Sequence, residues 1–240
     1  MTTAVQPPEH EADWVDLGLE RGPAEDLLDR CVELLDATGR DGRPRLRWYV
    51  STDSAIVLGR GQRHAEPVPG HVQLQRPSGG GAVLMDGDLL SLDVVLPADH
   101  PWLADDDLGA VFYPIGRAWA AALEHLGVAD VALHDGPATA TRLGPPEQRP
   151  LAEVCYASLG RSEVVVAGRK LVGLSQRRRR QGALVQCGVM RRWNPSPLVE
   201  ALAVDPARAA IERAAVGLDD VLVPPVSDFA LMRAVRAQLG

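Results

Sequence analysis

Hydrophobic positions along the chain follow two periods, and the change from one to the other predicts the order of helices and strands. Residues 23–39 place leucines and Cys31 at helical spacing between Pro23 and Gly39, which predicts an amphipathic helix. Shorter alternating or continuous apolar runs predict strands at 45–50, 54–59, 71–76, 79–85 and 88–97. One face of the last strand consists of Leu90, Leu92, Val94 and Leu96.

The second half of the chain mixes the same two patterns. A long helix is predicted over 107–127, with the acids at 105–107 at its start and Pro114 as a point where it could be interrupted. Further strands are predicted at 130–136, on both sides of a turn at Ala167–Gly168 within 161–176, and at 181–190. Helices follow from about residue 197. Since strands and helices do not strictly alternate, we predict a single α+β domain over 14–240, with a central mixed, largely antiparallel sheet flanked by helices.

The N-terminus and the scattered cysteines and histidines are typical of a cytoplasmic protein. Residues 1–13 contain prolines and acids but no apolar run, so we expect a flexible tail rather than a signal or transit peptide. No stretch has the length and apolarity of a membrane span. The cysteines and histidines lack metal-ligand spacing, so we expect neither a metal site nor a tightly bound cofactor. They include Cys31, Cys155, Cys187, His64, His71, His100 and His134.

Charge is distributed unevenly along the chain. The net charge of −7 argues against a nucleic-acid partner. Residues 161–192, however, contain nine basic residues and one acid, so the rest of the chain is strongly acidic. This basic segment suggests a docking surface for an anionic partner, and a solvated loop in an arginine-rich sequence is the alternative. Lys170 lies within the segment and is the only lysine of the chain.

Three consecutive glycines, Gly79–Gly81, lie between two predicted strands. Glycines are costly in conformational entropy, so they are expected where the main chain approaches a ligand closely or presents N–H groups to an anion. Arg76 precedes them and could hold a phosphate or carboxylate. The segment lacks the spacing of a Walker or dinucleotide-binding motif. A flexible hairpin loop is the alternative to a binding site.

Lys170 and Cys155 are the candidates for reaction chemistry. Lys170 lies between Gly168 and Gly173 at the start of a predicted strand, where its ammonium could project into a cleft and stabilise an oxygen that gains charge. Arginine is bulkier and planar, so it would not replace lysine there. A leftover lysine without a role is the alternative. Cys155 could be a nucleophile near the basic segment, although an isolated cysteine is more often a packing residue.

Segments 76–83 and 168–180 together resemble the two motifs of the lipoate-protein ligase and octanoyltransferase family, which shares its catalytic fold with biotin protein ligases. The first, RPSGGGAV, is similar to the family's arginine and triple-glycine motif, and the second, GRKLVGLSQRRRR, to its glycine and lysine segment. Segments 58–62 and 182–188 resemble the strands next to these motifs. The resemblance covers roughly residues 14–205 and implies a biotin/lipoate ligase-like α+β fold.

The resemblance also implies roles for individual residues. Lys170 would contact the acyl carbonyl or the phosphate of an acyl-adenylate. The acyl or adenylate pocket would be lined by Arg76, Gly79, Gly80, Gly81, Ala82, Val83, Gly173, Ser175, Gln176, Gly182 and Ala183. The acceptor would be a lysine on an acidic lipoyl carrier domain of the 2-oxoacid dehydrogenase or glycine cleavage type. That domain would dock on Arg177, Arg178, Arg179 and Arg180.

Three functions are compatible with the resemblance. A lipoate-protein ligase would attach a lipoyl or octanoyl group through an acyl-adenylate, with ATP and magnesium as co-substrates. An octanoyltransferase would take octanoate from acyl carrier protein through a thioester on Cys155, without ATP. A non-catalytic homologue would only bind an acyl chain or a partner. The sequence departs from the family at Met85, where histidine is usual, at Gln75, where a first arginine is usual, and in its short helical C-terminal segment.

Overall fold

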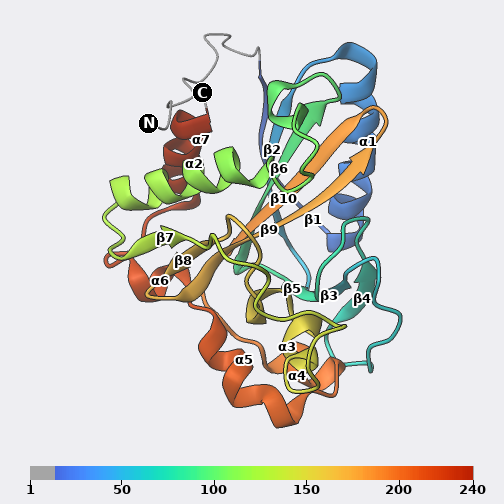
Figure 1. The fold of residues 1–240 in the computed structure, drawn as a ribbon, viewed down its shortest axis with the longest axis vertical. Coiled ribbons are helices and arrows are strands. Elements are labelled where there is room, and N and C mark those ends of the chain that lie inside the picture. The colour runs from blue at the N-terminus through green and yellow to red at the C-terminus, as the bar shows by residue number, and fades with distance from the viewer. Residues whose placement is uncertain (1–13, 240) are drawn as a thin grey trace.

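The computed structural model describes residues 14–239, so the predicted tail over 1–13 lies outside the described part of the chain. Seven strands form one large sheet (Figure 1). In spatial order they are β1 (Val15–Gly22), β2 (Arg45–Ser51), β6 (Leu89–Pro97), β10 (Gly182–Met190), β9 (Arg169–Arg179), β8 (Val164–Val166) and β7 (Val131–Leu133). β1 and β2 are parallel, and the other neighbours in this sheet are antiparallel. The predicted α+β class with a mixed, largely antiparallel sheet is confirmed.

A three-stranded sheet packs beside the large one. Its central strand is β3 (Ala55–Leu58), with β4 (Val72–Gln75) parallel on one side and β5 (Val83–Met85) antiparallel on the other. Val57 and Met85 of this small sheet share an apolar cluster with residues of the large sheet. The glycine motif connects β4 to β5, so it lies where the two sheets meet.

Helices cover both faces of the large sheet (Figure 1). α1 (Ala24–Asp41) covers one face and contacts Val95 and Leu184. α2 (Phe112–His125) and α7 (Asp228–Leu239) pack against each other on the opposite face. The four residues predicted to share one apolar face of β6 lie in one cluster with residues of α2 and α7. The other face of β6 therefore points to α1 and the small sheet, and its residues are available for the site.

The C-terminal segment joins the two sheets. α4 (Ser196–Ala201) and α5 (Arg208–Ala214) pack against the small sheet. α6 (Leu218–Val221) and α7 belong to the core of the large sheet. Between them Val216 N–H donates a hydrogen bond to the Lys170 carbonyl at 3.0 Å, so this segment also borders β9. None of the described helices is long and apolar enough to cross a membrane.

Two local predictions about helix boundaries are wrong. α2 begins at Phe112 rather than at 107, because the Asp107 carboxylate accepts a hydrogen bond from Gly109 N–H at 2.8 Å and forms a separate turn. Pro114 does not interrupt α2, because it lies in the first turn, where its missing N–H needs no partner. The edge strand β1 has mostly exposed or half-buried residues, so no clear apolar period in the sequence predicts it.

Candidate active site

The glycine motif forms a tight loop that Arg76 holds from inside. The chain turns at Gly80, whose φ of 97° is one that glycine adopts readily. The guanidinium of Arg76 is buried and donates hydrogen bonds to the carbonyls of Gly79 and Gly81, both at 2.9 Å. The Nε–H of Arg76, a buried donor next to the glycine loop, has no partner among the described residues.

The same loop packs against the main chain around Cys155. Ala82 N–H donates a hydrogen bond to the Glu153 carbonyl at 2.7 Å, and Cys155 N–H donates one to the Ala82 carbonyl at 2.9 Å. A Cβ atom on Gly81 would lie 2.7 Å from the Cys155 nitrogen, so a larger residue there would displace the main chain. The close approach that Gly81 allows is thus to Cys155, which directly follows α3 (Arg149–Glu153) and Val154.

Lys170 lies on the other side of Cys155. Its side chain is almost fully buried, with 1% of the residue exposed. The ammonium donates hydrogen bonds to the carbonyls of Cys155 at 2.8 Å and Ser158 at 3.1 Å, and it forms an ion pair with Glu163 at 2.6 Å. These three acceptors match the three donors of an ammonium group. A planar guanidinium would not fit them, which accounts for the lysine at this position.

Glu163 completes this arrangement, and sequence reasoning did not identify it. One carboxylate oxygen binds Lys170 and also accepts a hydrogen bond from Leu174 N–H at 2.9 Å, and the other accepts one from Gly160 N–H at 2.7 Å. Glu163 therefore ties β9 to the loop that carries Cys155. A weak signal for it exists in the sequence, because Glu163 is the one acid within the basic segment 161–192.

A narrow cavity of about 50 Å³ lies between the two sheets, beside these residues. Cys155 is half-buried and lines the cavity together with Arg76. Lys170 lies directly behind the lining, because a Cβ atom on Gly173 would be 3.2 Å from Lys170 Cε. The remaining lining residues are Leu28, Tyr49, Val57, Val83, Met85, Leu89, Ser91, Tyr156, Gly173, Leu174, Ser175, Gln186, Cys187 and Gly188.

Tyr156 lines the cavity and carries no charge. Burial raises the pKa of its phenol well above the usual range, and the proximity of Cys155 and Glu163 raises that pKa further. The neutral hydroxyl donates a hydrogen bond to the Gly188 carbonyl at 2.5 Å. Lys170 Nζ lies 5.3 Å from the centre of the ring. Tyr156 thus supports Lys170 without offering it a competing negative charge.

The three cysteines differ in their surroundings. Cys31 and Cys187 are buried, and burial raises the pKa of both thiols well above the usual range, which opposes formation of a thiolate. Cys155 is half-buried and has the cavity in front of it. Cys155 is therefore the cysteine placed to act as a nucleophile. Residues 14–239 contain no cluster of three or more histidine, cysteine, aspartate or glutamate side chains that could hold a metal ion.

Some predicted pocket residues lie away from the cavity. Gln176 follows the cavity residue Ser175, and successive residues of a strand point to opposite faces. The Gln176 side chain therefore lies on the far face, where it donates a hydrogen bond to the Leu108 carbonyl at 2.5 Å. Gly182 and Ala183 lie at the start of β10, outside the cavity lining, and Gly79, Gly80, Gly81 and Ala82 are not part of the lining either.

The four arginines do not form the single exposed patch that the sequence suggests. β9 continues to Arg179, so neighbouring arginines point to opposite faces of the sheet. Arg177 and Arg178 are half-buried, whereas Arg179 and Arg180 are exposed. Arg177 and Arg179 lie beside Asp36 of α1. Of these four arginines, the two exposed ones therefore lie together at the tip of the β9–β10 hairpin.

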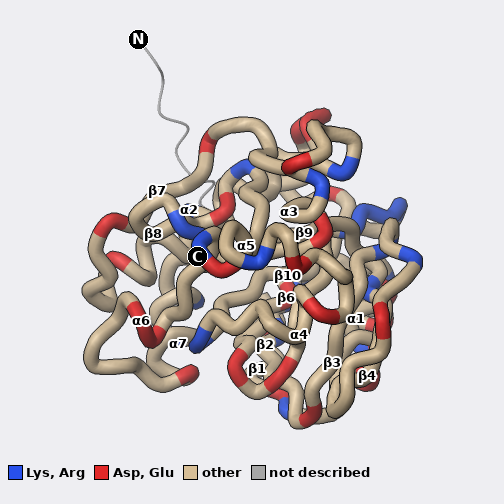
Figure 2. Tube along the Cα trace, turned by 90° about the horizontal axis from the view of Figure 1, so that it is seen from below, with Lys and Arg blue, Asp and Glu red and all other residues tan. Residues whose placement is uncertain are grey.

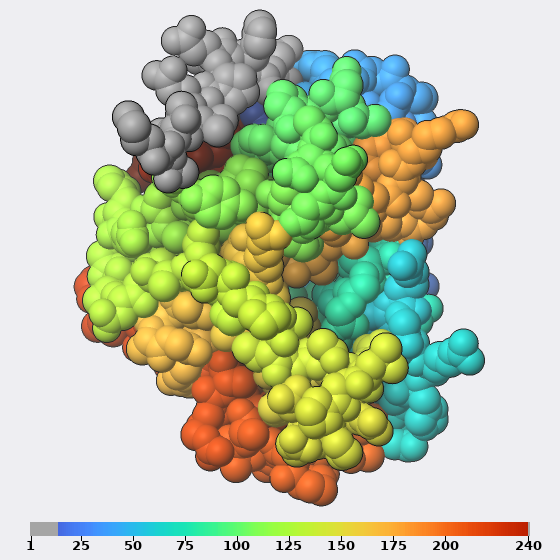
Figure 3. All heavy atoms as spheres, in the orientation of Figure 1, coloured from blue at the N-terminus to red at the C-terminus, as the bar shows by residue number. Residues whose placement is uncertain are grey.

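The Pro-rich connection over 136–148 covers the glycine loop from outside. Arg142 donates a hydrogen bond to the Gly80 carbonyl at 3.2 Å and forms an ion pair with Glu153 at 2.9 Å. Figure 3 shows this connection in yellow-green on the surface, beside the blue-green segment of the small sheet. The loop is thus fixed by arginines on both sides, Arg76 within and Arg142 outside.

Sequence comparisons identify a family for this chain. The family model described as the lipoyl protein ligase A/B catalytic domain matches residues 28–238. Octanoyltransferase LipM of Moorella thermoacetica is 30% identical over 81% of this chain and 72% of its own length. Octanoyltransferase LipM of Kyrpidia tusciae is 29% identical over 83% of this chain and 75% of its own length. The match to LipM of Carboxydothermus hydrogenoformans, at 28% identity, spans 56% of that protein.

Solved structures share the fold at lower identity. Lipoate-protein ligase A bound with ATP superposes with a TM-score of 0.65 at 19% identity, over 95% of this chain and 84% of that chain. A bi-partite lipoate protein ligase of Thermoplasma acidophilum, studied with its E2 lipoyl domain, gives a TM-score of 0.66 at 20% identity, over 93% of this chain and 81% of that chain. The predicted lipoate ligase-like fold is therefore confirmed.

Proposed function

The chain belongs to the lipoyl protein ligase A/B catalytic domain family, and on this premise we propose that it is an octanoyltransferase acting through a thioester on Cys155. The observation that carries the proposal is the position of Cys155. It lines the cavity, its N–H is bound by the glycine loop, and its carbonyl is bound by Lys170. The relatives named octanoyltransferase LipM support the same assignment.

The proposed reaction exchanges one acyl bond for another. Cys155 loses its thiol proton and its sulfur attacks the thioester carbonyl of octanoyl-acyl carrier protein. The carbonyl–sulfur bond of the donor breaks, and the donor sulfur leaves as a thiol by taking up that proton. The neutral amine of a lysine on a lipoyl carrier domain then attacks the Cys155 thioester. An amide forms, and Cys155 leaves as a thiol with the proton of the amine. Because the donor is already a thioester, this route needs no ATP.

Basic groups around Cys155 support both steps. The carbonyl oxygen gains negative charge each time the carbon is attacked, and fixed donors stabilise such an oxygen. Arg76 lines the cavity with its cationic guanidinium, whose buried Nε–H has no partner among the described residues. Lys170 acts first by fixing the Cys155 main chain, since its donors are bound to Cys155, Ser158 and Glu163. Its positive charge next to Cys155 is the second contribution.

The charge of the molecule supports the proposal that its partners are acidic. The β9–β10 hairpin tip carries Arg179 and Arg180 on an otherwise acidic protein. An acidic carrier domain would be steered to this tip by charge, as would acyl carrier protein. A reducing cytoplasm would keep Cys155 as a thiol, so we place the reaction there.

A mass measurement tests the proposal directly. The protein is incubated with octanoyl-acyl carrier protein and an apo lipoyl domain without ATP, and both the protein and the acceptor are weighed. We expect an octanoyl adduct on the protein and on the acceptor, and the loss of both in Cys155→Ala. The matched Cys187→Ala variant should still form the adduct, because Cys187 is buried. An acceptor modified equally by Cys155→Ala would exclude the thioester.

A lipoate-protein ligase is the second candidate, and one observation favours it. The unpaired Nε–H of Arg76 lies beside the glycine loop, where it could also bind the phosphate of an acyl-adenylate. In this case ATP and magnesium are co-substrates and lipoate is the acyl source. Incubation with lipoate, ATP and magnesium in place of the octanoyl donor tests this route. Acceptor modification that requires ATP and persists in Cys155→Ala would establish the ligase instead.

A further inference from the structure

Four strands of the large sheet each contribute one polar residue to a single row across it. Ser175 of β9 pairs with Gln186 of β10. Asp93 of β6 pairs with Gln186 on one side and with Arg47 of β2 on the other. Ser175 is half-buried, and the other three residues are buried. Because buried polar groups have lost their contacts with water, we expect hydrogen bonds to connect the row.

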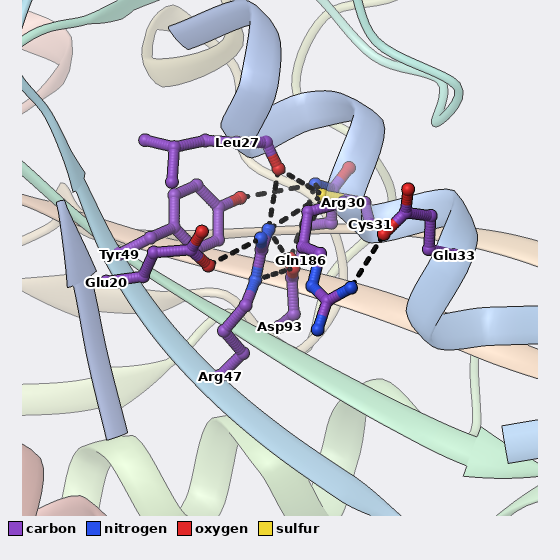
Figure 4. A network of polar contacts seen from close by, with 9 residues as sticks. All are labelled: Glu20, Leu27, Arg30, Cys31, Glu33, Arg47, Tyr49, Asp93 and Gln186. Carbon is purple, nitrogen blue, oxygen red and sulfur yellow. Dashed lines mark hydrogen bonds and ion pairs between the residues drawn. The ribbon is translucent and has the colours of Figure 1, made fainter. Parts of the chain in front are cut away.

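An ion pair fixes one end of the row, as Figure 4 shows. Arg47 Nη2 and Asp93 Oδ2 lie 2.8 Å apart. The Arg47 guanidinium also donates hydrogen bonds to the Leu27 carbonyl of α1 at 2.7 Å and to the Glu20 carboxylate of β1 at 3.1 Å. A buried charge that loses its partner is strongly destabilising, so neither side chain of the pair is free to turn away. Asp93 thus presents its carboxylate to Gln186 from a fixed position.

Asp93 determines which way round the amide of Gln186 lies. A carboxylate paired with arginine accepts hydrogen bonds and donates none, so it faces the –NH2 end of the amide. Gln186 Nε2 accordingly donates to Asp93 Oδ1 at 3.4 Å, and also to the Tyr49 hydroxyl at 3.3 Å. The amide oxygen of Gln186 is therefore directed away from Asp93, towards Ser78.

Ser78 binds this amide oxygen at the start of the glycine loop. Its hydroxyl donates a hydrogen bond to Gln186 Oε1 at 2.7 Å, and its oxygen accepts one from the Ser175 hydroxyl at 3.3 Å. Ser78 is 1% exposed and directly precedes Gly79–Gly81. In the part of the chain that the structure describes, the hydrogen bonds from residues 77–81 to the large sheet are these two.

The Ser78 contact differs from the contacts of Arg76. Arg76 binds carbonyls within the loop, so it sets the shape of the loop but not its place on the large sheet. The bond from Ser78 to Gln186 sets that place. Gly81 follows three residues later and lies so close to Cys155 that a Cβ atom would be 2.7 Å from the Cys155 nitrogen. A shift of Ser78 would therefore be passed on to Cys155.

We propose that Gln186 is a positioning residue for Cys155: oriented by Asp93, it holds Ser78 on the large sheet and thereby fixes the glycine loop against the Cys155 segment. The importance of this contact for acyl transfer rests on the proposed function. The placement of the loop follows from the hydrogen bonds alone. Loss of the Gln186 amide should therefore loosen the loop even where no acyl group is transferred.

Hydrogen–deuterium exchange measures the placement of the loop without any transfer reaction. Two N–H groups report on it, because Ala82 N–H binds the Glu153 carbonyl and Cys155 N–H binds the Ala82 carbonyl. In peptides that contain these groups, Gln186→Leu and Ser78→Ala should each speed exchange about tenfold, and exchange in α7 should stay unchanged.

A buried hydroxyl elsewhere on α1 provides the matched control. Thr38 is fully buried, and its hydroxyl accepts a hydrogen bond from Arg45 at 2.8 Å, with no contact to the glycine loop. Thr38→Val should therefore leave exchange at Ala82 and Cys155 unchanged.

A double variant tests whether the two residues act through one bond. Gln186→Leu combined with Ser78→Ala should speed exchange no more than the stronger single change. Where acyl transfer is measured, Ser78→Ala should lower kcat about tenfold through misplacement of Cys155. The KM for the octanoyl donor should change little, because Ser78 does not line the cavity.

The outcomes separate the positioning role from the proposed function. Unchanged exchange in the folded single variants would overturn the positioning role, even if octanoyl transfer takes place. Faster exchange would support it, even if neither transfer nor ligation is detected. Additive effects in the double variant, or an unchanged kcat in Ser78→Ala despite faster exchange, would also overturn it. If Gln186→Leu does not fold, Ser78→Ala decides by the same measurement.

Discussion

The position of Lys170 requires a compact ammonium group, which arginine does not provide. Its ammonium lies among the acceptors of Cys155, Ser158 and Glu163 in a buried position. The chain uses arginine at all of its other basic positions, including the neighbouring Arg169. The one lysine thus occurs where a compact charge with three donors is required, and its role is tied to the position of Cys155.

Replacing Lys170 by arginine should reduce acyl transfer by about 100-fold or more, because the guanidinium cannot bind the same three acceptors. Steady-state kinetics with octanoyl-acyl carrier protein and an apo lipoyl domain measure the effect. Arg180→Lys, the reverse exchange at an exposed position, serves as the control and should retain activity. Full activity of Lys170→Arg would show that the lysine has no special role.

Glu163 is a positioning residue, since it acts through Lys170. Glu163→Gln removes the charge partner of a buried ammonium and should lower the free energy of unfolding by about 3 kcal/mol. Urea denaturation measures this loss. Glu163→Gln combined with Lys170→Met should be less destabilising than the sum of the single changes, because the pair is then removed as a unit. Additive effects would mean that the ion pair contributes little.

At the scale of elements, the glycine loop and the segment that carries Cys155 fix each other's position through main-chain contacts. The Gly81 Cα lies against the main chain from Glu153 to Cys155. This contact joins the small sheet to the end of α3 and therefore sets the position of Cys155. The local conformation of the loop alone would not do so.

Gly81→Ala should abolish thioester formation while the protein remains folded. The added methyl would lie 2.7 Å from the Cys155 nitrogen and 2.8 Å from the Glu153 carbonyl oxygen, so the Cys155 segment must move. Adduct mass after incubation with the octanoyl donor measures the effect, with circular dichroism as the check on folding. Gly79→Ala is the matched control, because a Cβ there meets nothing within 4 Å. Equal losses in both variants would argue against a specific contact.

α1 begins without a cap from its own chain segment. Pro23 precedes it, and the Asp53 carboxylate beyond β2 accepts hydrogen bonds from Ala24 N–H at 2.8 Å and from the Ser51 hydroxyl at 2.7 Å. The hydrogen bonds from Ser51 and Ala24 lower the pKa of Asp53 below its usual value. The helix that borders the cavity is therefore anchored to β2 at its first turn.

Asp53→Ala should lower the free energy of unfolding by about 1 kcal/mol at pH 7, the usual effect of a lost helix cap. Because the folded-state pKa is lowered, this stability is present above the unfolded value of about 3.9 and is lost as the pH falls through the lower folded value. The difference between wild type and variant should thus shrink between pH 7 and pH 3, as urea denaturation can show. Asp106→Ala, in an exposed turn, should show no such dependence.

Over the whole molecule, the net charge is negative, but the tip of the β9–β10 hairpin is basic. The net charge is −7, yet Arg179 and Arg180 are exposed together at the end of the β9–β10 hairpin. Figure 2 shows acidic and basic residues interspersed along most of the tube. A negatively charged carrier domain would be oriented by its attraction to this tip.

Changing Arg179 and Arg180 together to glutamate should raise the KM for the lipoyl domain about tenfold and leave kcat nearly unchanged, because neither arginine lines the cavity beside Cys155. The difference from wild type should shrink when salt is raised, since exposed charges are screened. The control reverses Arg213 and Arg233, which are exposed on α5 and α7. An equal rise of KM in the control would indicate a general effect of net charge.

The sequence by itself determined the features that depend on local pattern. Apolar periodicity predicted most of the helices and strands, including the face of β6 that meets α2 and α7. The triple glycine and the unique Lys170 marked two parts of the site, because unusual residues at fixed spacing are visible without a fold. The class of the sheet followed from the order of these elements.

Only the tertiary structure decided which of these parts meet. It placed Gly81 against Cys155 and Glu163 against Lys170, and it directed Gln176 to the far face. It also aligned Tyr49 with Gly173 across four strands. Strand pairing and register arise from the packing of the whole core, so residues that are distant in sequence carry no local sign of their contact. The cavity is therefore a property of that pairing.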